Sequence, residues 1–483
     1  MKRVAWLPSL LLLIVTLHTC LSDVESNSTV EALALLNWKA SLLSLTNRSV
    51  LPSWTVSPGN AQANPCGWFG IHCKGDSVSR INLTSYGVKG TFHAFPFSSL
   101  PNLEELDLSI NGLFGTIPPQ INQLSNLTYL DLSYNQLSGR TPPQIGQLIH
   151  LKTLHLVQNL LNGSIPEEIE IGNLSSLQEL YIDNNQLAGS IPSTFGKLKH
   201  LRLLHLSTNS LSGSIPSEFG HMESLNELAL YKNNLSGFIP PSLGNLTDLT
   251  ILQLYENKLF GLIPEELGNL KLLVFLEWAS CNNLSSLQIA RNNITGRIPP
   301  ELGNSAQLQA LDLSSNHLVG EIPKKLTKLT SLTRLILSGN QLYGGIPMEV
   351  GSFSQLEYLD LSANRLSRSI PETIGDMLKL YYLNLSSNNF SLGIPRQIGK
   401  LVQVNELDLS HNMLSGEIPT QFQSLQSLST LNLSYNNLSG SITIFNELRG
   451  LVQVDIAHNE LEGPIPDVPA FQNASIQELE GNC

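Results

Sequence analysis

One motif recurs along most of the chain and limits the folds available to it. Its clearest copy is residues 308–331, which read L-x-x-L-x-L-x-x-N-x-L-x-G-x-I-P-x-x-L-x-x-L-x-x. Further copies follow about every 24 residues. A single copy cannot bury its own apolar edge, so neighbouring copies must stack and share one core. The chain is therefore expected to grow by adding coils and not by enlarging one globular domain.

Each position of the motif predicts a structural role. The segment L-x-x-L-x-L predicts a short strand whose alternate leucines point inward, and the stacked strands form a parallel sheet on a concave face. The asparagine turns the chain, and its amide satisfies backbone groups that would otherwise be buried and unpaired, as at Asn135, Asn209, Asn316 and Asn412. Glycine and proline in G-x-I-P then begin the second side. The predicted fold is an α/β repeat, a leucine-rich repeat solenoid of the 24-residue type.

The solenoid is expected to cover residues 78–463. Its first copy, residues 78–102, is slightly irregular. Two regular series follow, beginning at Leu103, Leu127, Leu151, Leu177, Leu201, Leu225 and Leu249, and at Leu284, Leu308, Leu332, Leu356, Leu380, Val404, Leu428 and Leu451.

The period is broken at two places. Residues 151–176 carry two extra residues, which a loop on the convex side can absorb. Residues 273–283 supply one strand signal and run directly into the next, so about half a coil is missing. This irregularity is either a functional hinge or the result of repeats lost by deletion or a faulty gene model. The motif resumes in phase on both flanks, which favours lost repeats.

The N-terminal residues predict secretion. Lys2 and Arg3 precede a short apolar run at residues 10–17, so residues 1–22 read as a signal peptide. About fifteen Asn-x-Ser/Thr sequons agree with passage through the secretory pathway. Those proposed as glycosylation sites are Asn27, Asn47, Asn82, Asn126, Asn162, Asn234 and Asn293.

Residues 23–77 are expected to cap the first coil. Residues 31–43 have apolar side chains at helical spacing, and Trp38, Trp54 and Trp68 are expected in the core of this cap. Cys66 and Cys73 stand immediately before the first repeat, and we expect a disulfide between them in an oxidising compartment.

Two further cysteines have no local partner. Cys281 is expected to be a buried free thiol. Residues 464–483 resemble the beginning of a C-terminal cap that stops at its first cysteine, Cys483, and we expect the chain to be truncated there.

These motifs together resemble the ectodomains of plant leucine-rich repeat receptor-like kinases. The resemblance rests on the L-x-G-x-I-P consensus, the opening Glu-Ala-x-Ala-Leu-Leu-x-Trp-Lys at residues 31–39, and the Trp-x-Gly-x-x-Cys of the cap at residues 68–73. Residues 308–322 and 356–370 also resemble the subgroup of receptors for secreted serine-rich plant peptides. The family would continue into a transmembrane helix and a kinase, but no kinase motif is present in this sequence, so no kinase activity is expected of it.

Composition excludes several other function classes. The net charge is −12 with 14% charged residues, which disfavours nucleic acid and anionic membrane surfaces as partners. No nucleophile–base pair or paired carboxylates stand out from the repeat, so we expect no enzyme, cofactor or metal. His155 and His205 lie two coils apart, roughly 9–10 Å at the usual strand spacing, which is too far to share an ion.

A ligand is expected on the variable positions of the concave strands. From residue 308 onward these positions are mostly small and polar, such as Asp312 and Ser314. Between residues 151 and 255 they become larger and aromatic, a composition favoured at binding hot spots. The predicted ligand-binding residues are His155, Tyr181, Asp183, His205, Tyr231, Gln253 and Tyr255.

Two functions are compatible with this sequence. The first is the extracellular sensor of a receptor-like kinase in peptide perception, signalling or defence, which binds a secreted peptide or protein and recruits a co-receptor kinase near its C-terminal coils. It would lie at the plasma membrane through a C-terminal segment missing here. The alternative is a secreted inhibitor or decoy that resembles the polygalacturonase-inhibiting proteins and stays in the apoplast if the chain ends at Cys483.

Overall fold

The computed structural model describes residues 27–43, 51–56, 63–165, 174–270 and 285–482. The chain divides into two units, residues 1–160 and 161–483. Several predicted features lie outside the described residues, namely the signal peptide, Asn47, the extra residues of the coil that begins at Leu151, the irregular segment 273–283 with Cys281, and Cys483.

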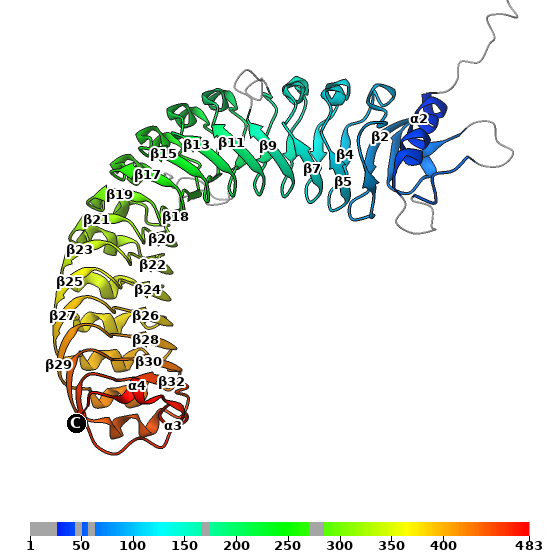
Figure 1. The fold of residues 1–483 in the computed structure, drawn as a ribbon. Coiled ribbons are helices and arrows are strands. Elements are labelled where there is room, and N and C mark those ends of the chain that lie inside the picture. The colour runs from blue at the N-terminus through cyan, green and yellow to red at the C-terminus, as the bar shows by residue number, and fades with distance from the viewer. Residues whose placement is uncertain (1–26, 44–50, 57–62, 166–173, 271–284, 483) are drawn as a thin grey trace, which may run out of the picture. The chain divides into compact units, whose positions relative to one another are not determined.

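The first unit begins with its cap (Figure 1). Helix α2 (Asn27–Ser41) starts four residues earlier than the apolar pattern predicts, because the polar residues of its first turn carry no apolar periodicity. Trp38 and Trp54 are fully buried, and the Trp54 and Trp68 rings stack with centroids 5.4 Å apart. The three tryptophans therefore form the core of the cap, as predicted.

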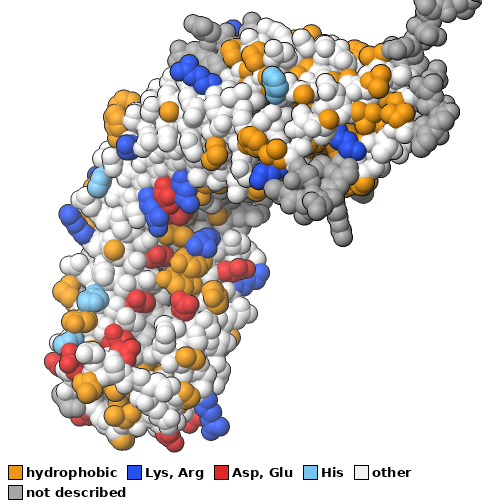
Figure 2. Space-filling view, turned by 45° about the vertical axis from the view of Figure 1, so that its right-hand side comes forward, with side chains coloured by type: hydrophobic (Ala, Val, Ile, Leu, Met, Phe, Trp, Pro, Cys, Tyr) orange, Lys and Arg blue, Asp and Glu red, His pale blue; other side chains and the backbone are white. Residues whose placement is uncertain are grey.

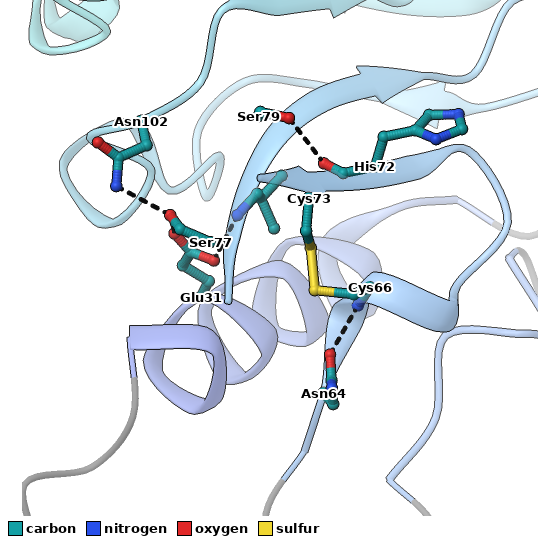
Figure 3. The surroundings of a disulfide bond; sticks show 9 residues. Glu31, Asn64, Cys66, His72, Cys73, Ser77, Ser79 and Asn102 are labelled. Atoms are coloured by element: carbon teal, nitrogen blue, oxygen red, sulfur yellow. Dashed lines mark hydrogen bonds between the residues drawn. A yellow bond between two sulfur atoms is a disulfide. The ribbon is translucent and has the colours of Figure 1, made fainter. Parts of the chain in front are cut away.

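A disulfide and a buried carboxylate hold the cap to the first strands (Figure 3). Cys66 and Cys73 are bonded, which confirms the predicted pair. Glu31 of α2 accepts hydrogen bonds from the Ser77 hydroxyl at 2.5 Å and from the backbone N–H of Val78 at 2.8 Å. Burial raises the pKa of Glu31, although these two hydrogen bonds act in the opposite direction.

The strands of the first unit form two rows. A primary sheet contains the L-x-x-L-x-L segments, and β1 joins it antiparallel to β2 while the later strands pair in parallel. These strands are β1 (Ile71–Lys74), β2 (Ser77–Asn82), β4 (Glu105–Asp107), β6 (Tyr129–Asp131) and β8 (Thr153–His155). The strands of a lateral row follow the motif asparagine of each coil, and they are β3 (Lys89–Gly90), β5 (Gly112–Gly115) and β7 (Gln136–Gly139). The next lateral strand, β9 (Leu160–Ser164), contains the boundary between the two units.

The second unit repeats the same two rows (Figure 1). Each primary strand pairs in parallel with the strand of the next coil, and equivalent motif positions lie opposite each other. Tyr181, His205, Ala229 and Gln253 therefore share one register position. The primary strands are β10 (Glu179–Tyr181), β12 (Leu203–His205), β14 (Glu227–Ala229), β16 (Ile251–Gln253), β18 (Ser286–Gln288), β20 (Ala310–Asp312), β22 (Arg334–Ile336), β24 (Tyr358–Asp360), β26 (Tyr382–Asn384), β28 (Glu406–Asp408), β30 (Thr430–Asn432) and β32 (Gln453–Asp455).

The lateral strands of the second unit also pair in parallel from coil to coil. They are β11 (Gln186–Ser190), β13 (Ser210–Gly213), β15 (Asn234–Gly237), β17 (Lys258–Gly261), β19 (Asn293–Gly296), β21 (His317–Gly320), β23 (Gln341–Gly344), β25 (Arg365–Arg368), β27 (Asn389–Leu392), β29 (Met413–Glu417), β31 (Asn437–Ser441) and β33 (Glu460–Glu462).

Short 3-10 helices close most of the described coils. Most of these helices begin directly after the proline of G-x-I-P, whose fixed φ suits the entry to a helix. They are η2 (Phe97–Ser99), η3 (Pro119–Gln123), η4 (Pro143–Gln147), η6 (Ser193–Lys197), η7 (Ser217–His221), η8 (Pro241–Asn245), η9 (Glu265–Asn269), η10 (Pro300–Asn304), η11 (Lys324–Lys328), η12 (Met348–Ser352), η13 (Glu372–Asp376), η14 (Arg396–Lys400), η15 (Thr420–Ser424) and η16 (Ile442–Glu447). A further 3-10 helix, η1 (Pro65–Gly67), lies in the cap.

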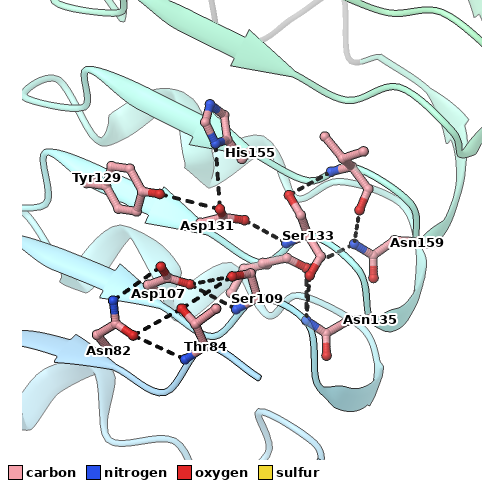
Figure 4. A network of polar contacts seen from close by, with 12 residues as sticks. Asn82, Thr84, Asp107, Ser109, Tyr129, Asp131, Ser133, Asn135, His155 and Asn159 are labelled. Atoms are coloured by element: carbon pink, nitrogen blue, oxygen red, sulfur yellow. Dashed lines mark hydrogen bonds and ion pairs between the residues drawn. The ribbon is translucent and has the colours of Figure 1, made fainter. Parts of the chain in front are cut away.

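The predicted asparagine ladder is present. Asn316 donates to the carbonyls of Ile289 and Leu313 at 3.0 and 3.1 Å and accepts from the N–H of Ile294 at 3.1 Å. Asn135 makes the equivalent bonds in the first unit (Figure 4). Each asparagine thus satisfies buried backbone groups of two adjacent coils, which locks the coils in register.

Residues after the last coil close the second unit. Helices α3 (Pro469–Asn473) and α4 (Ile476–Leu479) lie against β32, and Phe471 packs against Phe445 with ring centroids 5.7 Å apart. Asn482 donates to the carbonyl of Ile456 at 3.0 Å and accepts from the N–H of Leu461 at 3.2 Å. Asn482 therefore takes the ladder position of a further coil and covers the edge of the last strand.

Candidate functional site

The regular coils use the ends of their primary strands for local hydrogen bonding. Asp312 accepts from the backbone N–H of Ser314 at 3.0 Å and from its hydroxyl at 2.6 Å. Asp360 and Ser362 repeat both bonds at the same distances. The monotonous Asp-x-Ser pattern therefore has a structural role, since it caps a backbone donor at the turn. A coil that replaces this aspartate with a ring gives up that carboxylate acceptor.

His155, in the first unit, replaces such an aspartate and is tied into a polar network (Figure 4). Its Nδ1 lies 3.6 Å from Asp131 Oδ2, and both side chains are less than one-fifth exposed. Burial acts to raise the pKa of Asp131, but hydrogen bonds from His155 and Ser133 outweigh it and hold the pKa below its usual value. His155 thus lies on the predicted face, but little of its side chain is accessible to a ligand.

Tyr181 and His205 form the first ring pair of the second unit. They occupy the same register position on β10 and β12, and their rings stack with centroids 4.4 Å apart. His205 Nε2 lies 3.2 Å from the Glu227 carboxylate on the next strand. Burial, together with the nearby carboxylates of Glu179 and Glu227, raises the pKa of Tyr181 to about 12. The Tyr181 phenol therefore stays neutral and able to donate a hydrogen bond at physiological pH.

Tyr231 and Tyr255 form the second ring pair, two residues beyond the strand ends. Their rings are nearly parallel, with centroids 4.5 Å apart and planes 5° from each other. Burial and the neighbouring Tyr231 raise the pKa of Tyr255 to about 12. Gln253 follows Ala229 in the register row of Tyr181 and His205. The two ring pairs therefore occupy four successive coils of one sheet.

Asp183 lies two residues beyond Tyr181 and is half-buried. It accepts a hydrogen bond from the side chain of Asn184 at 2.8 Å. A carboxylate at this place adds a negative charge beside the Tyr181 ring, where a cationic or hydroxyl group of a ligand could bind.

A third ring cluster was missed by the sequence reasoning. Arg334, Tyr358 and Tyr382 occupy the first position of β22, β24 and β26 and are in register. The two tyrosine rings are parallel at 4.0 Å, and the Arg334 guanidinium carbon lies 4.2 Å above the Tyr358 ring. Burial raises the pKa of Tyr358. Comparison of this first strand position between coils would have found the cluster.

A further aromatic row lies along the turns of the C-terminal coils. His411, Tyr435 and His458 precede the ladder asparagines, and their rings follow one another at 4.3 Å spacing. Tyr435 is 48% exposed, and the nearby Met413 is 54% exposed. The row presents apolar surface at the edge of the primary sheet.

The sequons differ in accessibility. Asn126, Asn162, Asn234 and Asn293 are exposed. Asn82 is half-buried, and its amide nitrogen lies 3.4 Å from Asp107. Asn27 is the first residue of α2.

On the face drawn in Figure 2, charged side chains are sparse and hydrophobic ones occur in small groups. The described residues contain no group of three or more His, Cys, Asp or Glu side chains that could hold a metal ion. Within those same ranges, no helix is long and apolar enough to span a membrane.

The stacked coils, the cap and the ring-bearing sheet define a repeat scaffold that presents an extended surface for contact with another molecule. Models of leucine-rich repeat regions match residues 119–260, 282–342, 354–414, 102–124 and 427–448, and the leucine rich repeat N-terminal domain matches residues 28–74. The chain belongs to the leucine-rich repeat family, and its matched relatives include plant receptor kinases.

One such relative is MDIS1-interacting receptor like kinase 2 of Arabidopsis thaliana, which is 45% identical over 108 residues. The match covers 22% of this chain and 10% of that protein, so most of the relative lies outside the comparison.

Two solved structures are similar over much longer stretches. The plant peptide hormone receptor RGFR1 in complex with RGF2 has a TM-score of 0.70 and 33% identity, covering 80% of this chain and 65% of that one. The Arabidopsis receptor kinase HAESA, solved with the peptide hormone IDA and the co-receptor SERK1, has a TM-score of 0.51 and 30% identity, covering 92% of this chain and 87% of that one. Fold and N-terminal cap are thus those of plant receptor ectodomains.

Proposed function

We propose that this chain is the extracellular, ligand-binding region of a plant receptor-like kinase and that it senses a secreted peptide. The observation that carries the proposal is the pair of ring stacks, Tyr181 with His205 and Tyr231 with Tyr255, on successive coils of the primary sheet. Such rings combine apolar area with polar tips and lose little conformational freedom on binding. Similar ectodomains solved with peptide hormones support the proposal.

An extended peptide would lie across the strands and meet one ring or polar group per coil. Neutral Tyr181 and Tyr255 would donate hydrogen bonds to peptide carbonyls, and Asp183 would accept from a cationic or hydroxyl side chain. The protein would act at the cell surface after secretion, in signalling or defence, without chemistry of its own in this region.

A co-receptor kinase is the second proposed partner. The exposed row of His411, Tyr435 and His458, with Met413 beside it, supports docking near the C-terminal coils. The solved complex of HAESA with a peptide hormone and the co-receptor SERK1 supports a partner of this kind.

The ligand proposal is tested with immobilised, secreted protein and the peptide fraction of plant apoplastic fluid. Wild-type protein should enrich a peptide that mass spectrometry identifies, and Tyr181→Ala with His205→Ala should weaken its measured affinity by roughly 30-fold or more. Glu406→Ala, on the same sheet at β28, is the matched control and should bind normally.

Equal affinity of the wild type and the double variant would show that the ring surface is not the peptide site. If the wild type retained a wall-degrading hydrolase and no peptide, the inhibitor alternative would replace the proposed function.

A further inference from the structure

A cluster of apolar side chains lies on or directly after the lateral strands β15 and β17 of the second unit, away from the ring pairs described above. Phe238, Phe260 and Leu262 are 63%, 43% and 63% exposed. The Phe238 and Phe260 rings meet edge to face with centroids 4.9 Å apart. Exposed apolar groups gathered in this way usually have an occupant.

The cluster borders an open groove of about 910 Å³. Its apolar lining includes Phe238, Leu262 and Pro300, and Glu265, Glu301 and Arg297 supply charged groups along it. The backbone favours this arrangement, because Gly261 and Gly296 leave room for Phe238 and Leu262, and a Cβ at either glycine would collide with those side chains. The groove is therefore a built feature of three successive coils.

A glycosylation sequon begins at the edge of this groove. It is Asn293-Ile294-Thr295 on β19, and Asn293 is exposed. Asn293 pairs in register with Phe260 on β17, so the two side chains are direct neighbours on the outer face. Thr295 lines the groove itself, and its hydroxyl donates to the carbonyl of Gly261 at 3.3 Å.

Other sequons at the same position of the repeat have a different neighbour. Asn234 pairs with Ser212, Asn389 with Ser367, and Asn437 with Ser415. Of these four equivalent asparagines, Asn293 alone has an aromatic partner in strand register, whereas Asn437 borders a separate pocket lined by Tyr435 and His458. A sugar attached at Asn293 thus has an aromatic neighbour in register that a sugar at Asn234 or Asn389 lacks.

We propose that Asn293 carries an N-linked glycan whose first sugars lie over Phe260, Phe238 and Leu262 and fill the apolar groove. The apolar C–H face of a pyranose ring matches an aromatic face, and its hydroxyl and acetamide groups can bond to Arg297 and Glu301. The inference rests on the secretory passage assumed in the proposed function. It does not depend on a peptide ligand.

The covalent step needs a lipid-linked oligosaccharide in the secretory pathway. The side-chain nitrogen of Asn293 forms a bond to C1 of the first sugar and loses one proton. The bond from C1 to the lipid pyrophosphate breaks, and the lipid pyrophosphate leaves with the bonding electron pair.

The test uses the full chain secreted from mammalian cells that are held at high-mannose glycans. Glycopeptide mass spectrometry measures occupancy, and endoglycosidase H, which cuts between the first two sugars, measures their accessibility in the folded protein. Asn293 should be occupied, and its glycan should be cleaved roughly tenfold more slowly than the glycan at Asn234. Phe238→Ser with Phe260→Ser should raise the Asn293 rate to that of Asn234.

A second measurement does not depend on the double variant. Thr295→Ala removes the Asn293 sequon and should increase binding of an apolar fluorescent dye, whereas Ser236→Ala, which removes the Asn234 sequon, should not. Equal cleavage rates at the two sites, or a bare Asn293 beside occupied Asn126 and Asn234, would overturn the inference and leave the peptide-sensing proposal intact. Absence of glycans from every sequon would overturn both the inference and the secretory assumption.

Discussion

Replacement of Asn316 by alanine should loosen the contact between its own coil and the preceding coil. The Asn316 side chain is buried and bonds to backbone groups of two adjacent coils. Alanine leaves the N–H of Ile294 without its partner. The carbonyls of Ile289 and Leu313 each lose one amide donor and keep another, because Asn292 and Asn340 still donate to them at 3.1 and 3.0 Å. The desolvation of the Ile294 N–H is then uncompensated until water enters or the coils separate.

The magnitude follows from the one backbone group left unpaired, the N–H of Ile294. A buried polar backbone group without a partner costs about 1–3 kcal/mol. At 1.4 kcal/mol per factor of ten, the middle of this range corresponds to roughly a 30-fold loss of local protection. The effect should remain local, because each coil of a solenoid contacts only its neighbours.

Hydrogen exchange followed by mass spectrometry measures this loss directly. Peptides that contain Ile294 should exchange roughly 30-fold faster in the Asn316→Ala variant, and peptides from residues 428–440 should be unchanged. Gln307→Ala, at an exposed amide of the neighbouring coil, is the control and should leave both regions unchanged. Loss of protection below about threefold at Ile294 would refute the assignment of these bonds as the main local constraint.

An isosteric variant adds a pH dependence with a definite sign. Asn316→Asp keeps an acceptor for the Ile294 N–H but places a carboxyl against two carbonyl oxygens. Burial and these oxygens raise the pKa of the new carboxyl above its unfolded value of about 3.9. The destabilisation should therefore be small below that pH and increase as the pH rises to neutrality. A penalty independent of pH would contradict this reasoning.

Two further predictions concern the cap and the ring pairs. Cys66→Ser with Cys73→Ser should destabilise the cap by about 2–3 kcal/mol, as expected for opening a short loop, and thermal unfolding of the cap measures this change. In a spectrophotometric titration, Tyr181 and Tyr255 should ionise near pH 12. Because these pKa values are raised, the stability that the neutral phenols contribute is present below about pH 10 and is lost as the pH rises through about 12.

The fold could be predicted from the sequence because the repeat encodes it many times over. Each coil supplies the same inward leucines and the same asparagine, so the parallel register follows from the period alone. The cap was also predictable, because Trp38, Trp54 and the Cys66–Cys73 pair precede the first repeat and must cover its open end. The start of α2 at Asn27 was not, since its first turn is polar and carries no apolar signal.

The candidate site was only partly predictable, because stacking depends on pairs of coils. The aromatic character of Tyr181 and Tyr255 is visible in the sequence. Their partners, His205 and Tyr231, can be predicted from a spacing of one coil. The contact with Asp131 that leaves His155 largely buried could not be predicted in this way. The side-chain geometry that reduces the exposure of a ring is set by neighbours that no single motif contains.

The cost of placing rings on the primary sheet explains where a site can arise. An Asp-x-Ser hydrogen bond contributes about 0.5–1.5 kcal/mol, and a stacked aromatic pair contributes a similar amount. A ring pair such as Tyr181 and His205 replaces two aspartates and gains one stack, so the stack offsets about half of the lost hydrogen bonding.

The Arg334, Tyr358 and Tyr382 cluster follows a different route. Tyr358 stands before Asp360 on the same strand, and Asp360 keeps its bonds to Ser362. Rings at the first strand position thus add apolar surface without removal of the capping carboxylate. The Asp and Ser positions of these coils are uniform, so they gave no sign of the rings of Tyr358 and Tyr382. A binding surface on this sheet can consequently extend through coils that look regular, and the first strand position must be compared from coil to coil to find it.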